Sequence, residues 1–172
     1  LASARITVII DIGFGDAIEP GVEEINLPVL LGLPAPRLRA YARETVVAEK
    51  FHAIVMLGLA NTRMKDFYDV WMLSRNYDFD GERLCRAIAA TFERRRTAIP
   101  EEVPDALTSA FSTDVTKQRQ WAVFVRDLAA EVPSLETIVN DLAVFLMPHA
   151  RQTTQQRGAA DRGTPWSGSD PI

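Results

Sequence analysis

The sequence predicts an α+β fold in which short strands come first and a bundle of helices follows. Residues 5–12, RITVIIDI, form a short run rich in β-branched side chains, which favours a strand. Beyond residue 44, apolar residues recur at spacings of three and four, which is typical of amphipathic helices. We therefore expect strands within residues 1–43, a helical domain over residues 44–149 and a disordered tail over residues 150–172.

Two further short strands are expected before the helices begin. The dipeptide Pro20-Gly21 is a turn signal, and the pattern after it predicts strands near residues 24–27 and 38–42. Prolines between these strands make residues 28–36 an extended connection rather than a helix.

The helical domain is expected to hold several amphipathic helices. The first has a strong amphipathic pattern, and Gly58 and Asn61 lie where it should stop. Beyond Pro148 the chain has few aliphatic side chains and many Gln, Thr, Gly and Ser. This composition predicts a disordered segment, because the segment cannot bury enough apolar surface to offset the entropy lost on ordering. The periodic apolar residues place helices over residues 45–59, about 67–75, about 81–96, 105–111, about 121–128 and 135–146.

Composition argues against a strongly basic protein, a disulfide-linked fold and a membrane-spanning protein. A chain of 172 residues is long enough for about one domain, and its net charge of −4 gives no overall positive field that would attract nucleic acid. The single cysteine, Cys85, cannot form an internal disulfide, and its place in a helical pattern indicates a small buried side chain. Because the sequence has no apolar run long enough to span a membrane and no signal-like start, we expect a cytoplasmic protein.

Charged residues lie beside apolar core positions in the first two predicted helices. Lys50 directly precedes Phe51, and Lys65, Asp66 and Asp69 follow one short loop later. The two aspartates are three residues apart, so they share one helix face, and Lys65 with Asp69 forms an i,i+4 pair. Such charges belong either to a solvated helix face or to the edge of a site, and the residues alone leave both interpretations open.

Asp11 is a second candidate, in the stretch VIIDIGFGD. A carboxylate among β-branched residues is costly to bury unless it meets a cation or a donor, so Asp11 should face either a metal ion or solvent. His52 and His149 are too far apart in sequence for metal-ligand spacing, and we assign neither of them to a site.

The succession IDIGFGD, YARETVVAEKFHAIV and NTRMKDFYDVWML resembles the second half of the AbiEii/AbiGii toxins. These are nucleotidyltransferase-fold toxins of abortive-infection and type IV toxin–antitoxin systems. The resemblance is good over residues 5–75 and looser over the later helices. It implies a remnant of a polymerase β-like nucleotidyltransferase sheet followed by a helical bundle.

The resemblance also implies an activity. A family member would use Mg²⁺ to transfer a nucleotide from an NTP to an RNA acceptor, with tRNA as the expected acceptor and a cognate antitoxin as partner. The roles carried over are metal binding for Asp11, catalysis for Lys50, Asp66 and Asp69, and phosphate binding for Lys50, Arg63 and Lys65.

One part of the family pattern is missing from this chain. The family carries a G-S motif with a pair of acids before its third acid, whereas no G-S followed by D-x-D precedes Asp11 here. We therefore expect the chain to be a truncated form that is inactive alone, since metal ligands supply most of the charge stabilisation in such chemistry. The competing hypotheses are a non-catalytic helical module that binds a partner protein, or a decaying remnant of the enzyme.

Overall fold

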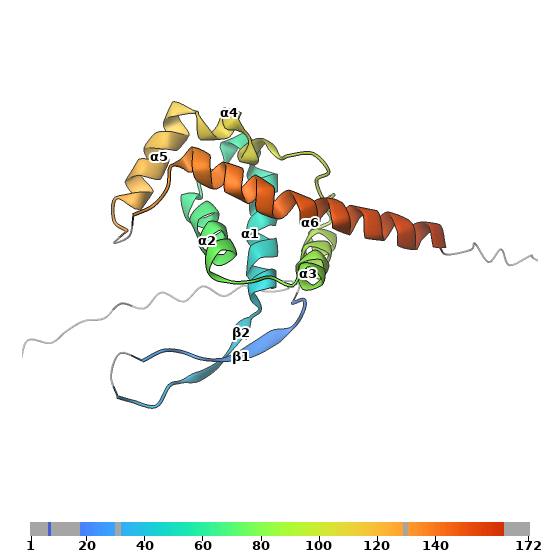
Figure 1. Cartoon of the computed structure of the whole chain (residues 1–172), viewed down its shortest axis with the longest axis horizontal. Coiled ribbons are helices and arrows are strands. Elements are labelled where there is room, and N and C mark those ends of the chain that lie inside the picture. Colours follow the sequence, from blue (N-terminus) through green and yellow to red (C-terminus); the bar gives the residue numbers. More distant parts are fainter. Residues whose placement is uncertain (1–6, 8–17, 30–31, 129–130, 164–172) are drawn as a thin grey trace, which may run out of the picture.

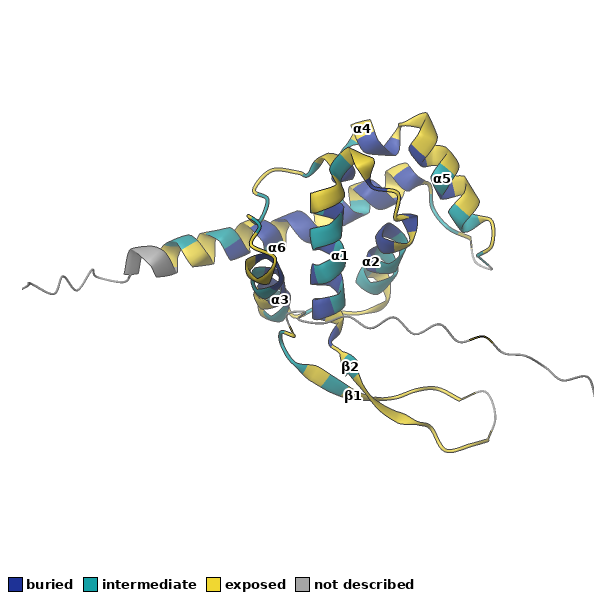
Figure 2. Ribbon diagram, turned by 180° about the vertical axis from the view of Figure 1, so that it is seen from behind, coloured by how far each residue is buried: buried dark blue, intermediate teal, exposed yellow. Residues whose placement is uncertain are grey.

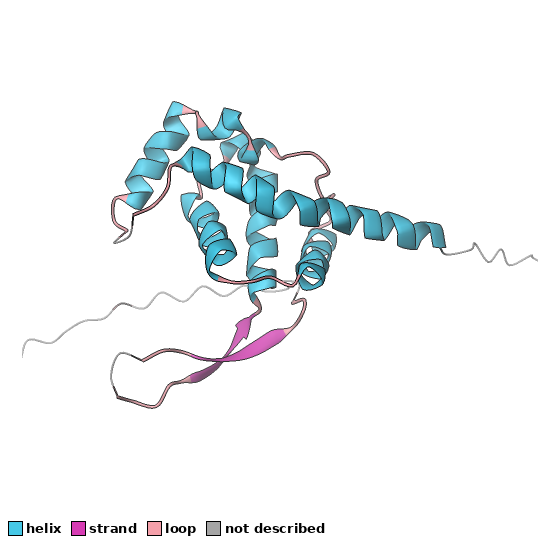
Figure 3. Cartoon of the chain, in the orientation of Figure 1, coloured by secondary structure: helices cyan, strands magenta, loops and turns pink. Residues whose placement is uncertain are grey.

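A two-stranded hairpin leads into a bundle of helices in the computed structural model, which describes residues 7, 18–29, 32–128 and 131–163 (Figures 1 and 3). This arrangement confirms the predicted α+β class. Asp11 and, apart from Thr7, the strand predicted over residues 5–12 lie outside the described residues.

The hairpin pairs β1 (Val22–Asn26) with β2 (Arg37–Tyr41) in an antiparallel register. Val22 lies opposite Tyr41, and Asn26 lies opposite Arg37. Both predicted strands are confirmed, each beginning one or two residues earlier than expected. The hairpin projects away from the helices, and β2 ends just before the first helix begins (Figure 1).

Six α-helices and two short 3₁₀ helices follow β2 in the described residues, and each segment predicted to be helical contains at least one of them. The segment expected over residues 105–111 is divided between a 3₁₀ turn and a single α-helical turn. The elements are α1 (Arg43–Leu57), η1 (Gly58–Ala60), α2 (Met64–Asn76), α3 (Gly81–Arg94), η2 (Asp105–Leu107), α4 (Ser109–Ser112), α5 (Val115–Val125) and α6 (Leu135–Gly163).

Helix α1 occupies the middle of the bundle, with α2 and α3 on either side of it (Figures 1 and 2). Its apolar stripe is fully buried at Phe51 and Ile54, as is Phe92 on α3. The rings of Phe51 and Phe92 lie 5.6 Å apart, centroid to centroid. Full burial of side chains of this size stabilises the fold by about 1.5–3 kcal/mol each, so the contact between α1 and α3 anchors the core.

A glycine ends α1, as the sequence predicted. Gly58 has φ of 49° and ψ of −135°, a conformation that residues with a Cβ rarely adopt. Its N–H still donates to the carbonyl of Ile54, which closes the last turn.

Helix α6 lies across the bundle and covers α2, α3 and α4 (Figure 1). The residues that it buries are Ile138, Leu142 and Leu146, each with no exposed surface. Because these side chains meet several helices at once, α6 completes the core.

The prediction of a disordered tail from residue 150 is corrected for residues 150–163, where α6 continues. Pro148 lies inside the helix but is exposed, as is Val144 one turn earlier, so the carbonyl left without a donor is on the solvent side. Ala150 and Thr153 are buried, and Thr153 Oγ1 donates to the carbonyl of His149 at 2.7 Å. Two small buried side chains thus extend the packing where composition showed few aliphatic ones.

Candidate functional site

The charged residues singled out in the sequence meet where α1 packs against α2. Lys50 Nζ on α1 lies 2.6 Å from Asp66 Oδ1 and 2.8 Å from Asp69 Oδ2, both on α2. Asp66 is only 2% exposed, and the side chain of Lys50 is 21% exposed. The cluster is therefore an interhelical ion pair at the edge of the core, rather than a fully solvated helix face.

Two more cations border the same carboxylates. Lys65 Nζ lies 2.6 Å from Asp69 Oδ2, as the i,i+4 spacing predicted. Arg63 Nε lies 2.7 Å from Asp66 Oδ2, but this oxygen is buried and accepts no hydrogen bond. Asp66 thus retains an acceptor that the surrounding residues do not fully satisfy.

The loop that carries Arg63 is held by residues that sequence analysis did not connect with the site. Asn61 is fully buried, and its Oδ1 accepts the backbone N–H of Arg63 at 2.8 Å. Its carbonyl accepts a 2.7 Å hydrogen bond from Lys117 Nζ on α5. The start of α2 is therefore fixed in position by a contact between residues 56 positions apart.

The ion pairs control the charge of the cluster. Burial lowers the pKa of the Lys50 ammonium, but the hydrogen bonds and negative charges of Asp66 and Asp69 outweigh it and leave this pKa above its usual value. Burial likewise raises the pKa of Asp69, but Lys50 and Lys65 outweigh it and bring this pKa below its usual value. At neutral pH, Lys50 is therefore positive and Asp69 negative.

Lys50 and Arg63 also line a cleft of about 560 Å³ along the outer side of α1, which we call the α1 cleft. Arg95 lines it as well, and its guanidinium lies 3.0 Å from Glu49 Oε2. A cleft with three cations and an apolar wall suits an anion that carries an apolar group. Its one acidic lining residue is Glu49, and its remaining lining residues are Tyr41, Thr45, Val46, His52, Ala53, Met56 and Leu57.

The histidines serve packing in this fold. His52 Nε2 lies 3.0 Å from Thr97 Oγ1, and burial together with the nearby Arg95 lowers the His52 pKa. His149 Nδ1 lies 2.8 Å from the carbonyl of Phe145 on α6. They occupy separate environments, because His52 lines the α1 cleft whereas His149 lies on α6.

The described residues do not fit a magnesium site. No group of three His, Cys, Asp or Glu side chains within them could hold a metal ion. Asp66 and Asp69 already face cationic partners at 2.6–2.8 Å. Asp11, the predicted metal ligand, lies outside the described residues, so its role stays a prediction.

Comparison with known proteins agrees with the resemblance. Residues 1–146 match the sequence profile of a family described as nucleotidyl transferase AbiEii toxins of type IV toxin–antitoxin systems. The chain belongs to the AbiEii family. No curated protein and no solved structure matches it. Membership of the AbiEii family implies an antitoxin partner, and none of the helices in the described part of the chain has both the length and the apolar character needed to cross a membrane.

Proposed function

We propose that this chain provides the nucleotide-binding helices of a toxin that transfers a nucleotide from an NTP to an RNA acceptor, with tRNA as the expected acceptor. The observation that carries the proposal is the position of Lys50. Its ammonium is held between two carboxylates and lines the α1 cleft, together with Arg63 and Arg95. An RNA acceptor and an antitoxin are both compatible with a cytoplasmic location, which we include in the proposal.

In this proposal each charged residue has a defined task. Lys50 acts as a point charge on the oxygens of the triphosphate, and Arg63 binds its outer phosphates. Lys65 does not line the α1 cleft, so the phosphate-binding role predicted for it is not placed on the triphosphate. Asp66 and Asp69 orient the Lys50 ammonium toward the cleft. The oxygen of the acceptor hydroxyl attacks the α-phosphorus and its proton passes to solvent. The bond between the α-phosphorus and the oxygen that bridges it to the β-phosphorus breaks, and pyrophosphate leaves with the electron pair of that bond.

In the proposal, Asp11 is the residue that binds Mg²⁺, and the helices provide no ligand for it. The paired acids that the family places ahead of this residue would be the remaining ligands. Because the described residues offer no three-ligand group, we assign the metal no role at Asp66 or Asp69.

Incorporation of labelled NTP into total tRNA, with Mg²⁺ and with chelator, tests the proposal. It should be measured with this chain and with a form extended upstream to include G-S and D-x-D motifs. Lys50→Gln should reduce incorporation by the extended form about 10²-fold or more, because the triphosphate loses a preorganised charge. Arg75→Gln is the matched control, since Arg75 also forms an interhelical ion pair, with Asp141, but does not line the α1 cleft.

Activity of the extended form that is lost in Lys50→Gln and kept in Arg75→Gln would support the proposal. Incorporation that survives Lys50→Gln, or no incorporation by either form, would refute it. A non-catalytic module that binds a partner protein would then be the better account of the bundle.

A further inference from the structure

A second cleft, of about 650 Å³, lies between the start of α2 and one side of α5. We call it the α5 cleft. It is formed by residues far apart in sequence, and the motifs that led to Lys50 include none of its α5 side. Its lining residues are Thr62, Arg63, Met64, Lys65, Asp66, Thr116, Arg119, Gln120, Val123 and Phe124.

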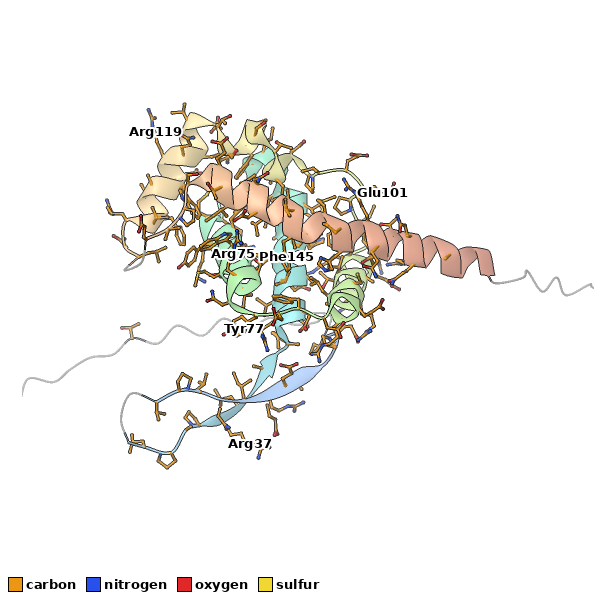
Figure 4. All side chains as sticks on the ribbon, in the orientation of Figure 1. Arg37, Arg75, Tyr77, Glu101, Arg119 and Phe145 are labelled. Atoms are coloured by element: carbon orange, nitrogen blue, oxygen red, sulfur yellow. The ribbon has the colours of Figure 1, made fainter. Side chains whose placement is uncertain are left out.

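The α5 cleft concentrates positive charge on a chain whose net charge is −4. Arg63, Lys65 and Arg119 line it, and Asp66 is its single acid. Arg63 is paired with Asp66, and Lys65 is paired with Asp69. Arg119 is exposed on α5 and has no ion-pair partner among residues 18–29, 32–128 and 131–159, whose side chains are described (Figure 4). Its guanidinium is therefore available to an anionic ligand.

The apolar side of the α5 cleft presents an aromatic ring in a fixed orientation. The ring of Phe124 lies 5.7 Å from Tyr68 in an edge-on contact and 5.5 Å from Trp121. Trp121 is itself anchored, because it is 5% exposed and its Nε1 donates to the carbonyl of Pro133 at 3.2 Å. A ring braced in this way offers a flat apolar surface at little entropic cost.

Gln120 adds a polar group without a partner. Its Oε1 is buried and has no hydrogen-bond partner in the described structure, although the residue lines the α5 cleft. A buried amide oxygen in that state is costly unless a ligand supplies a donor. The edge of a nucleobase presents N–H donors of this kind.

We propose that the α5 cleft binds the single-stranded end of an RNA, with a base against Phe124, its edge on Gln120 and its phosphates on Arg119 and Lys65. Stacking surface, an amide and cations together are the elements that recognise unpaired nucleotides. A protein partner is less favoured, because three cations line this cleft and only two of its apolar residues, Val123 and Phe124, are not buried. Naming this strand as the nucleotide acceptor rests on the proposed function.

Arg63 gives the two clefts a common border. It lines both the α1 cleft and the α5 cleft, and its backbone is fixed by Asn61. A strand end in the α5 cleft is therefore adjacent to a triphosphate bound by Lys50. This is the juxtaposition that transfer to a terminal hydroxyl requires.

Fluorescence anisotropy of a short labelled single-stranded oligoribonucleotide tests the proposal with the full chain. Arg119→Glu should weaken binding about tenfold or more and reduce the salt dependence of log K by about 0.7, because one phosphate is no longer neutralised. Gln120→Ala should weaken binding a few-fold and leave the salt dependence unchanged. Arg126→Glu is the matched control, because Arg126 is at the end of the same helix, has a 72% exposed side chain and does not line the cleft.

Equal losses in Arg119→Glu and Arg126→Glu would overturn the proposal, since they would indicate a general effect of net charge. Unchanged RNA binding in Arg119→Glu would also overturn it, and loss of antitoxin binding in that variant would instead make the cleft a protein-docking surface. If nucleotide transfer is never observed but Arg119→Glu still weakens RNA binding selectively, the proposed function fails and the α5 cleft stands.

Discussion

Replacing Lys50 by methionine should destabilise the fold by about 3 kcal/mol. The substitution keeps the length of the side chain but removes the ammonium that lies 2.6 Å from the carboxylate of Asp66. Asp66 is 2% exposed, and removing one partner of a buried ion pair typically costs about 3–5 kcal/mol, because the other charge stays buried. The lower end applies because the Lys50 side chain is 21% exposed and Arg63 Nε stays 2.7 Å from Asp66.

Urea unfolding followed by helical circular dichroism at neutral pH measures this loss. In a thermal melt it corresponds to a fall in Tm of about 6–12 °C for a chain of this size. The double variant Lys50→Met with Asp66→Asn should recover most of the stability, because it leaves no uncompensated buried charge.

The pH dependence supplies an independent check. The ion pairs depress the folded-state pKa of Asp69, so the stability that this carboxylate contributes is present above its unfolded value of 3.8 and is lost as pH falls below it. The difference between wild type and Lys50→Met should therefore shrink below about pH 4. A variant within about 0.5 kcal/mol of wild type at neutral pH, or a double variant less stable than Lys50→Met, would contradict the electrostatic argument.

Two other substitutions test the fold itself. Asp141→Asn should lower the free energy of unfolding by about 0.5–1 kcal/mol at neutral pH and by progressively less below pH 3.8. Burial raises the Asp141 pKa, but the hydrogen bonds from Arg75 and Trp71 outweigh it and lower this pKa. Urea titrations at several pH values measure the difference between variant and wild type, and a difference that does not change with pH would contradict the argument. Gly58→Ala should cost about 1–3 kcal/mol in a thermal melt because of the positive φ of 49°, whereas Gly81→Ala, where no such φ occurs, should have little effect; equal losses would contradict the strain argument.

Periodicity predicted the helices well because each one buries a single stripe. Phe51 and Ile54 on α1 belong to the apolar residues whose spacing of three and four predicted this helix, and both are fully buried. The ends of α1 were shifted by two residues at each end, because helix ends depend on local cap geometry.

The continuation of α6 beyond residue 149 was not predicted, because amino-acid composition does not show which side chains contact one another in the fold. Ala150 and Thr153 carry little apolar surface, yet both are buried in the structure. Gln152 and Gln156 both reach Glu82 on α3 at 3.5 Å. Contacts between residues about 70 positions apart leave no periodic signal in a single sequence.

The candidate site also has a part that the sequence predicted and a part that it did not. The resemblance grouped Lys50, Asp66 and Asp69, and the structure brings these three together, although their catalytic roles stay predictions. Nothing in the sequence linked them to Lys117 or Arg119, because the approach of α5 to the start of α2 is decided by tertiary packing. Motifs can identify residues within neighbouring helices, whereas a cleft between distant helices has to be read from the fold.

The position of α6 has a consequence for synthesis of the protein. The side chains that close the core, up to Leu146, are translated about 70 residues after α2 ends at Asn76. At about 5–20 residues per second, the inner face of α2 stays uncovered for roughly 4–14 s, until the chain up to Leu146 has been synthesised. Throughout that interval the nascent toxin presents an apolar surface to chaperones and proteases, and a message cut short before α6 yields a chain whose core can never close.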